Sequence, residues 1–240
     1  MRFAGKTEKG LRPQNEDCFM LLDAGSVKAV AVSDGMGGHR AGEIASRISV
    51  ETLEEMLLHS KSEPEAALSC AFAEANATVH ERAAEDDDLY GMGCTLVAAI
   101  LEKDRFIAAN IGDSRLYYFD GNTLKQITHD HSFVAELVRR GAITPEEAKV
   151  HPRRNLITRA VGTESRVSTD IFSCAWKAND MLLLCSDGLC GVLDDVEMAE
   201  TLLNCIDLDA TCALLIEQAL HAGSRDNITV VLAKNDGGNA

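Results

Sequence analysis

The feature that most constrains the fold is a pattern that recurs along the chain, in which a short apolar stretch adjoins an acidic residue beside a small one. Each apolar stretch has the length of a β-strand, and strand ends of one sheet system can converge in space. A fold containing these strands is therefore expected to bring several carboxylates to one edge. The acidic positions are Glu16, Asp17, Asp34, Asp113, Asp187 and Asp226.

An aspartate at the end of a strand has two interpretations. A single Asp-Gly pair such as Asp34-Gly35 is most often a turn. Repetition at five strand edges favours a shared site, where grouped carboxylates repel unless a cation compensates their charge. Oxygen ligands without a Cys or His cluster select Mg²⁺ or Mn²⁺ over zinc. The carbonyl of Gly35 is a further candidate ligand, because a residue without a side chain permits close approach to the backbone.

Two such ions about 3.5–4 Å apart form an arrangement that enzymes use on phosphate esters. Arg12 lies shortly before Glu16 and can fork two phosphate oxygens, so it is a candidate phosphate binder. His39 follows the glycines after Asp34 and is a candidate proton donor to the leaving oxygen. A single Arg is ordinarily a solvent-exposed side chain without a catalytic role, and a single His ordinarily has a structural role. Both assignments therefore depend on the acidic cluster.

Apolar runs bounded by Gly, Asp or Asn predict short strands. Tight polar connections at Glu102–Asp104 and Asp120–Asn122 favour antiparallel hairpins between neighbouring strands. The predicted strands are Cys18–Leu22, Lys28–Ser33, Gly93–Glu102, Arg105–Ile111, Arg115–Asp120, Met181–Ser186 and Asn227–Lys234.

Apolar residues at helical spacing predict two long helices and several short ones. We expect a capping box of Ser62 and Glu65 to begin the second helix, and Thr144-Pro145-Glu146-Glu147 is another capping box. Hairpins in the middle and helices in pairs indicate an α+β fold of antiparallel sheet covered by helices. The predicted helices are Ala41–Leu58, Glu63–Glu85, Ser132–Arg140, Asp194–Asn204 and Asp209–Ala222.

The charge balance excludes two classes of partner. Among 240 residues, 38 are Asp or Glu and 23 are Lys or Arg, so the net charge is −15. Nucleic acid and anionic membranes are polyanions that repel such a chain. The eight cysteines have no CxxC or metal spacing and are expected to be free thiols in a reducing cytosol. No apolar signal region is visible at the N-terminus, so we expect a cytoplasmic protein.

Eight motifs follow one another along essentially the whole chain. They are Arg12…Asn15-Glu16-Asp17, Ser33–His39, Gly93-Cys94-Thr95, Asn110–Arg115, Thr128–Ser132, Asn155–Gly162, Ser186–Leu189 and Arg225–Thr229. With these motifs the chain resembles the PPM (type 2C) metal-dependent Ser/Thr protein phosphatases, particularly the small bacterial ones.

The resemblance implies one catalytic domain over residues 1–240. It implies a central sandwich of two antiparallel β-sheets, flanked by antiparallel helix pairs in four layers, with a mobile flap at about residues 132–166. It also implies two tightly bound Mn²⁺ or Mg²⁺ ions and a third, weaker one. By resemblance, Asp34 bridges both ions, the Gly35 carbonyl is a further ligand, and Asp187 and Asp226 bind one of the ions. Glu16 lies near the other ion, Asp17 is a supporting acid, and Asp113 binds the third ion. Arg12 binds the phosphate, and His39 is the general acid.

The activity implied by the resemblance is hydrolysis of phosphoserine and phosphothreonine in proteins, by attack of a water that the two ions activate. Such an enzyme opposes a Ser/Thr protein kinase. We therefore expect a monomer whose partners are phosphorylated proteins, and neither nucleic acid nor a membrane.

Three other functions are open on the residues alone. A metal phosphohydrolase acting on small molecules would prefer nucleotides or sugar phosphates to phosphopeptides. A nonenzymatic module that binds phosphoproteins would keep Arg12 without needing every metal aspartate. A calcium-binding structural protein is disfavoured, because the acidic residues do not follow EF-hand spacing.

Overall fold

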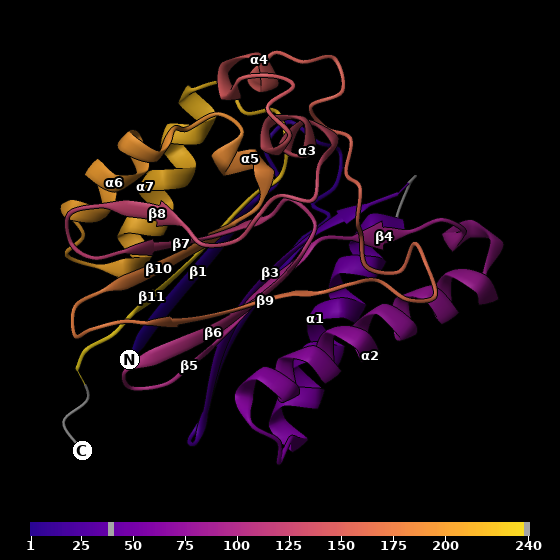
Figure 1. Ribbon diagram of the computed structural model, residues 1–240, viewed down its shortest axis with the longest axis horizontal. Coiled ribbons are helices and arrows are strands. Elements are labelled where there is room, and N and C mark those ends of the chain that lie inside the picture. The colour runs from indigo at the N-terminus through magenta and orange to yellow at the C-terminus, as the bar shows by residue number, and fades with distance from the viewer. Residues whose placement is uncertain (38–40, 238–240) are drawn as a thin grey trace.

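The computed structural model describes residues 1–37 and 41–237, and its two β-sheets lie face to face between two pairs of helices (Figure 1). All strand pairs in both sheets are antiparallel. The first sheet has the order β1 (Arg2–Glu8), β11 (Ile228–Lys234), β10 (Met181–Cys185), β7 (Arg115–Phe119) and β8 (Leu124–Gln126). The second has the order β2 (Asp17–Ala24), β3 (Val27–Met36), β5 (Leu96–Leu101), β6 (Arg105–Ile111) and β9 (Asp170–Ala175), and β4 (Gly93–Cys94) pairs with β3.

Helices cover the outer face of each sheet, which confirms the predicted α+β sandwich. The pair α1 (Ala41–His59) and α2 (Pro64–Glu85) packs on the second sheet, and α6 (Asp195–Leu203) and α7 (Leu208–His221) pack on the first. A segment between β8 and β9, residues 132–166, carries α3 (Phe133–Arg139) and α4 (Pro145–Lys149), and we call it the flap segment. The four-residue α5 (Asp187–Cys190) follows β10, and a 3₁₀ turn covers Asp87–Leu89.

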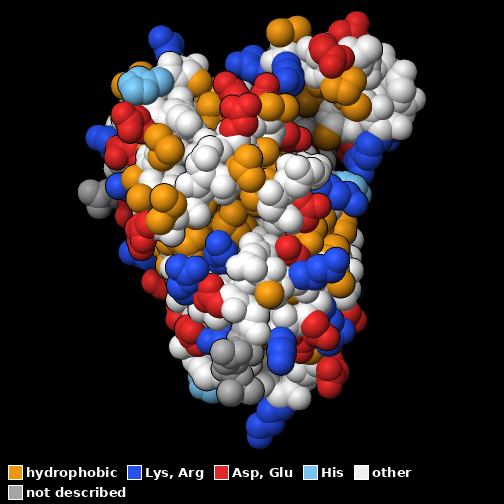
Figure 2. Space-filling model, turned by 90° about the vertical axis from the view of Figure 1, so that its left-hand side faces the viewer, with side chains coloured by type: hydrophobic (Ala, Val, Ile, Leu, Met, Phe, Trp, Pro, Cys, Tyr) orange, Lys and Arg blue, Asp and Glu red, His pale blue; other side chains and the backbone are white. Residues whose placement is uncertain are grey.

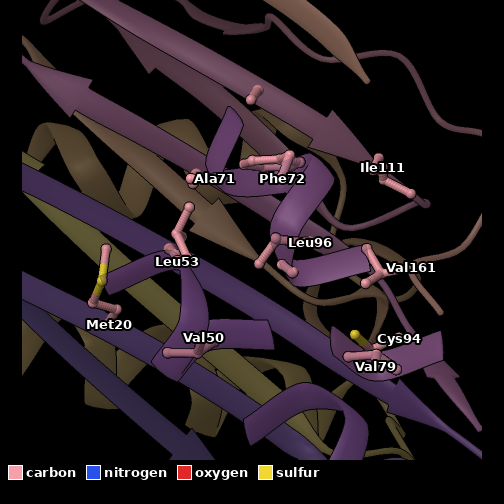
Figure 3. Close-up of a cluster of buried hydrophobic side chains, with 14 of the residues drawn as sticks. Met20, Val50, Leu53, Ala71, Phe72, Val79, Cys94, Leu96, Ile111 and Val161 are labelled. Atoms are coloured by element: carbon pink, nitrogen blue, oxygen red, sulfur yellow. The ribbon is translucent and has the colours of Figure 1, made fainter. Parts of the chain in front are cut away.

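The layers follow from the two-residue period of a strand, whose successive side chains point to opposite faces. In β3, Ala29 and Ala31 pack against the helices, whereas Val30 and Val32 pack between the sheets. Figure 3 shows the core on the helix side, where Leu53 of α1 and Phe72 of α2 lie over the sheet. Small alanines on the helix-facing side of β3 leave room for these larger side chains.

Two predicted strand boundaries are wrong in a way that affects the site. β3 continues to Met36, so Asp34 and Gly35 lie within the strand and pair with neighbours instead of following it. The predicted strand Gly93–Glu102 is divided into β4 and β5 at Thr95. Thr95 exchanges bonds with Asp34 instead: its N–H donates to the Asp34 carbonyl at 2.8 Å, and its Oγ1 accepts from the Asp34 N–H at 2.9 Å.

The predicted Ser62/Glu65 capping box is also wrong. α2 begins at Pro64, and the N-cap position is Glu63, without a side-chain capping bond. Proline has its φ preset for the first position of a helix, where the N–H that it lacks would have no partner within the helix. The Thr144/Glu147 box is confirmed at the start of α4. α7 begins one residue before the predicted Asp209.

Within the described residues, no helix combines the length and the apolar character needed to cross a bilayer.

We expect the packing between the sheets to dominate stability near the strand ends. Leu184 is fully buried between the sheets in β10, three residues before Asp187, whereas Leu203 at the end of α6 is 63% exposed. Leu184→Ala should lower the free energy of unfolding by about 2–5 kcal/mol, because it leaves a cavity. Leu203→Ala should change it by less than about 0.5 kcal/mol. Guanidinium unfolding measures both, and equal effects would contradict this assignment of the core.

Candidate metal centre

Asp17 ties the two sheets together at the edge where the acidic residues gather. It faces Asp34 across β2 and β3, and its side chain is buried. Its Oδ2 accepts hydrogen bonds from the hydroxyls of Ser186 at 2.8 Å and Thr229 at 2.7 Å. Both belong to the other sheet: Ser186 directly follows β10, and Thr229 lies in β11. Its Oδ1 is buried and has no hydrogen-bond partner among the described residues. Asp17 therefore fixes the position of β2, and of its paired strand β3, relative to β10 and β11.

Gly35 occupies a place that no other residue fits. Its N–H donates to the carbonyl of Glu16 at 3.0 Å. A Cβ at this position would lie 2.1 Å from the Gly42 carbonyl oxygen in α1 and 2.6 Å from the Glu16 carbonyl oxygen. The backbone of β3 thus approaches the start of α1 and the chain before β2 closely, which brings Glu16 beside Asp34-Gly35.

Asp187 and Asp226 meet because β10 and β11 are antiparallel neighbours. Asp187 follows β10 and opens α5, while Asp226 precedes β11, so the end of one strand lies beside the start of the next. Asn227 then fixes the loop before β2. Its amide N donates to the carbonyls of Lys9 at 2.8 Å and Gln14 at 2.9 Å, and its Oδ1 accepts from the Glu16 N–H at 2.8 Å.

Asp113 is held at the end of β6 through its neighbour Gly112. Gly112 has φ +106°, a conformation that other residues rarely adopt, and a Cβ there would lie 2.6 Å from the Thr95 side chain. Its N–H donates to Nδ1 of His131 at 3.1 Å, and its carbonyl accepts from the His131 N–H at 3.0 Å. The His131 Nε2 lies 3.1 Å from the Asp170 carboxylate, which Arg159 also binds at 2.9 Å.

Arg12 reaches the same edge and pairs with an acidic residue of the cluster. Its guanidinium N–H donates to Oδ2 of Asp226 at 2.6 Å, and half of the Arg12 side chain is exposed. A guanidinium has five N–H donors, so this ion pair leaves donors available for another anion. Arg12 therefore lies where an anion entering the carboxylate cluster would meet it.

Crowding and burial disfavour the ionised forms of these carboxyl groups. Burial, reinforced by the charges of Asp17, Asp187 and other neighbours, raises the pKa of Asp34 well above its usual range. Burial and the charge of Asp187 raise the pKa of Asp113 to about 7. Burial raises the pKa of Asp17 to about 7 although Thr229 and Ser186 oppose the rise. Burial and then Asp226 raise the pKa of Asp187.

These residues form a set of oxygen donors whose mutual repulsion a divalent cation would relieve. Burial also raises the pKa of Glu16, and the charge of Arg12 opposes this rise. In the part of the chain that the structure describes, no three His, Cys, Asp or Glu side chains stand close enough to hold one ion between them. The carboxylates therefore share one edge of the sandwich, and their oxygen donors fit Mg²⁺ or Mn²⁺.

The structure thus places the predicted acidic residues and Arg12 at one end of the sandwich. His39 lies outside the described residues. Sequence reasoning missed the uncharged residues that position the cluster: Ser186, Thr229, Asn227 and Thr95. Each adjoins a predicted acidic residue or lies in a quoted motif, and this adjacency was the one available signal.

Comparison with known proteins identifies the family. The model of the family described as protein phosphatase 2C matches residues 8–221.

The chain belongs to the protein phosphatase 2C family. The serine/threonine phosphatase stp of Listeria welshimeri is 41% identical over 238 residues, which cover 96% of this chain and 94% of that protein. The serine/threonine protein phosphatase PstP of Mycobacterium tuberculosis is 39% identical and is matched over 97% of this chain and 45% of its own length.

Solved structures of protein phosphatase 2C relatives have the same fold. The serine/threonine phosphatase Stp1 from Staphylococcus aureus superposes with a TM-score of 0.92 at 36% identity, covering 97% of this chain and 94% of that one. The catalytic domain of PstP in complex with two manganese ions superposes with a TM-score of 0.87 at 37% identity, covering 97% of both chains.

We expect His131 to make this end of the fold sensitive to acid. Burial lowers the pKa of His131, although the bond to Asp170 opposes this shift. The Gly112 N–H donates to Nδ1, so the folded state favours the neutral ring. The unfolded chain binds a proton near pH 6.5, so stability is retained above that pH and lost as pH falls below it.

Chemical unfolding at about pH 7.5 and about pH 5.5 tests this, and the wild type should lose about 1 kcal/mol more than His131→Gln over this interval. His59→Gln changes an exposed histidine at the end of α1 and should retain the wild-type pH dependence. An identical pH dependence of the wild type and His131→Gln would contradict the assignment.

Proposed function

We propose that this protein is a metal-dependent phosphatase that removes phosphate from phosphoserine and phosphothreonine in proteins. The observation that carries the proposal is the convergence of the carboxylates from both sheets beside Arg12, at one end of a protein phosphatase 2C fold. The names of the stp and PstP relatives, which are Ser/Thr phosphatases, support the substrate class.

We assign two ions to this edge, as in the manganese complex of PstP. Asp34, the Gly35 carbonyl, Asp187, Asp226 and Glu16 would hold them. Asp17 would support the cluster through its bonds to Ser186 and Thr229. Asp113, whose burial and high pKa favour a shared cation, would bind a third, weaker ion. Either Mn²⁺ or Mg²⁺ suits these oxygen ligands.

The protein's own residues would bind and orient the phosphoryl group. When bound, such a pair of ions supplies Lewis-acid stabilisation of the phosphate and activates water for attack. Arg12 would use its remaining N–H donors to hold phosphate oxygens, which fixes the group for in-line displacement. His39 would protonate the leaving Ser or Thr oxygen. This chemistry requires no cysteine nucleophile.

The proposal includes where and with what the enzyme acts. We infer a monomeric cytoplasmic enzyme with one catalytic domain and a flap over residues 132–166. It would act on phosphoproteins made by a Ser/Thr protein kinase. The net charge of −15 supports the exclusion of nucleic acid and anionic membranes as partners.

Hydrolysis of a phosphothreonine peptide with and without Mn²⁺ tests the function. We expect turnover that Mn²⁺ restores after chelation, and little turnover of nucleotides or sugar phosphates. Asp34→Asn should reduce kcat by at least about 100-fold, because a neutral amide balances less cation charge. The matched control Asp88→Asn, at an exposed carboxylate of the 3₁₀ turn, should keep wild-type activity. Calorimetry should show that Asp34→Asn weakens Mn²⁺ binding.

Activity of Asp34→Asn within about tenfold of the wild type, with unchanged Mn²⁺ binding, would exclude Asp34 as a bridging ligand. Binding of phosphopeptide without turnover would support a nonenzymatic module instead. Preference for nucleotides would support a small-molecule phosphohydrolase.

The role of His39 can be tested by changing the leaving group. His39→Ala should lower kcat on a phosphothreonine peptide by about 100-fold, because an alkoxide leaves poorly without a proton. On p-nitrophenyl phosphate the loss should be within about threefold, since nitrophenolate needs little protonation. Equal losses on the two substrates would rule out a general acid at His39.

A further inference from the structure

A cleft of about 710 Å³ extends the metal centre toward the flap segment. Asp113 and Asp187 of the acidic cluster line it, together with residues of α3, α4 and the α5–α6 region. In Figure 1, α3 and α4 project beyond the strand ends next to α5, and Figure 2 shows the surface hollowed beside an upper lobe of the molecule. This volume is typical of a ligand cleft and exceeds what one phosphoryl group fills, so there is room for neighbouring residues of a substrate peptide.

The flap segment has a charge opposite to that of the rest of the chain. Residues 132–166 contain seven Lys or Arg and four Asp or Glu, a net charge of +3. Since the whole chain carries −15, the remaining residues carry −18. An acidic substrate is therefore repelled by the body of the molecule and attracted by the wall that the flap segment contributes to the cleft.

Three cations on this wall are uncommitted. Arg139, Lys149 and Arg154 line the cleft, and among the described residues none of them forms an ion pair or donates a side-chain hydrogen bond. Other arginines nearby are engaged: Arg115 binds Asp130 through two nitrogens, and Arg140 pairs with Glu136. The three cations are thus available to an anion from outside.

Helical periodicity explains why these cations face the cleft. In α3, the residues that line it are Val134, Ala135, Val138 and Arg139, which share one helix face. In α4, Pro145, Ala148 and Lys149 share a face in the same way. Each helix therefore presents short apolar side chains with one cation, a surface that suits an extended peptide carrying an acidic side chain.

The acidic residues on the opposite wall do not neutralise these cations. Asp194 and Glu197 line the cleft at the start of α6. Asp194 Oδ1 accepts the N–H groups of Val196 and Glu197, both at 3.0 Å, and Glu197 Oε2 accepts the Asp194 N–H at 2.9 Å. These bonds hold both carboxylates at the N-terminus of α6, where negative charge is favoured. Among the described residues, neither carboxylate forms an ion pair with the three cations.

From this arrangement we propose that Arg139, Lys149 and Arg154 form a specificity subsite for an anionic group of the phosphopeptide other than the phosphate that is removed. The substrates are then Ser/Thr phosphoproteins with acidic residues, or a second phosphate, near the phosphorylated residue. The inference rests on the proposed phosphatase function and names its substrate class. Because the subsite contacts a remote part of the peptide in both the ground and the transition state, it acts mainly on KM.

A peptide series tests the subsite directly. The reference is a phosphothreonine peptide with neutral flanking residues, and a single Glu is placed in turn at each position up to about six residues on either side, about 3.3 Å apart in extended chain. We expect kcat/KM to rise about tenfold at one or two positions on one side, through a lower KM, and to fall toward the reference between about 0.05 M and about 0.5 M salt. Phosphoserine at the favoured position compares a second phosphate with a carboxylate.

A charge-matched pair of variants separates the subsite from general attraction. Arg139→Gln with Arg154→Gln removes two cations that line the cleft, and should bring the acidic-to-neutral ratio of kcat/KM close to one. Arg140→Gln with Arg166→Gln removes two exposed cations of the same flap segment that do not line the cleft, and should retain the wild-type ratio. Each ratio compares two peptides on one preparation, so differences in folded fraction cancel.

The outcomes distinguish failure of the inference from failure of the proposed function. Equal hydrolysis of all peptides by the wild type would overturn the subsite and leave the phosphatase function standing. A uniform gain at every Glu position, or equal losses in the two double variants, would also overturn it in favour of long-range steering. Absence of turnover on every phosphopeptide with Mn²⁺ would overturn the proposed function itself.

Discussion

The arrangement of this molecule depends on a buried carboxylate that joins two sheets. Asp17 belongs to one sheet and accepts hydroxyl hydrogen bonds from Ser186 and Thr229 of the other. The apolar core packs the two sheets face to face, and the two directed bonds to one carboxylate fix their relative position at this edge. Asp34 and Asp187 come from different sheets, so their proximity depends on this link.

The same edge concentrates charge that folding alone does not favour. Burial and mutual repulsion raise the pKa values of Asp34, Asp113 and Asp187, which means that the ionised cluster opposes the folded state. Burial of the continuous apolar layers between the sheets and under both helix pairs stabilises the fold and offsets this electrostatic repulsion. A site of this kind is stable because rigid strands hold it, and it becomes favourable when a cation shares its charge.

The acidic edge was predictable from sequence because acidic residues recur beside several apolar strands, and strand ends of one sheet system can lie close together. Asn227 and Ser186 were not predicted as supports, since uncharged polar residues serve many local purposes and only the folded chain shows their partners. The capping box at Ser62 failed because Pro64 competes for the helix start. The flap cations were unremarkable in sequence, because which of them face the cleft depends on how α3 and α4 are placed.

A strongly acidic protein that binds phosphate needs local positive charge at the binding site, because its overall negative charge repels the phosphate. The carboxylate edge attracts cations but repels a phosphate dianion, so anion binding there requires Arg12 and bound metal charge together. The flap segment adds further positive charge at Arg139, Lys149 and Arg154, on a wall of the cleft separate from the strands that hold the acidic cluster. Arg159 of the flap segment helps to support the cluster through Asp170 and His131, but Arg139, Lys149 and Arg154 take no part in those contacts. Substrate preference can therefore change at these three positions without disturbing the geometry of the metal centre.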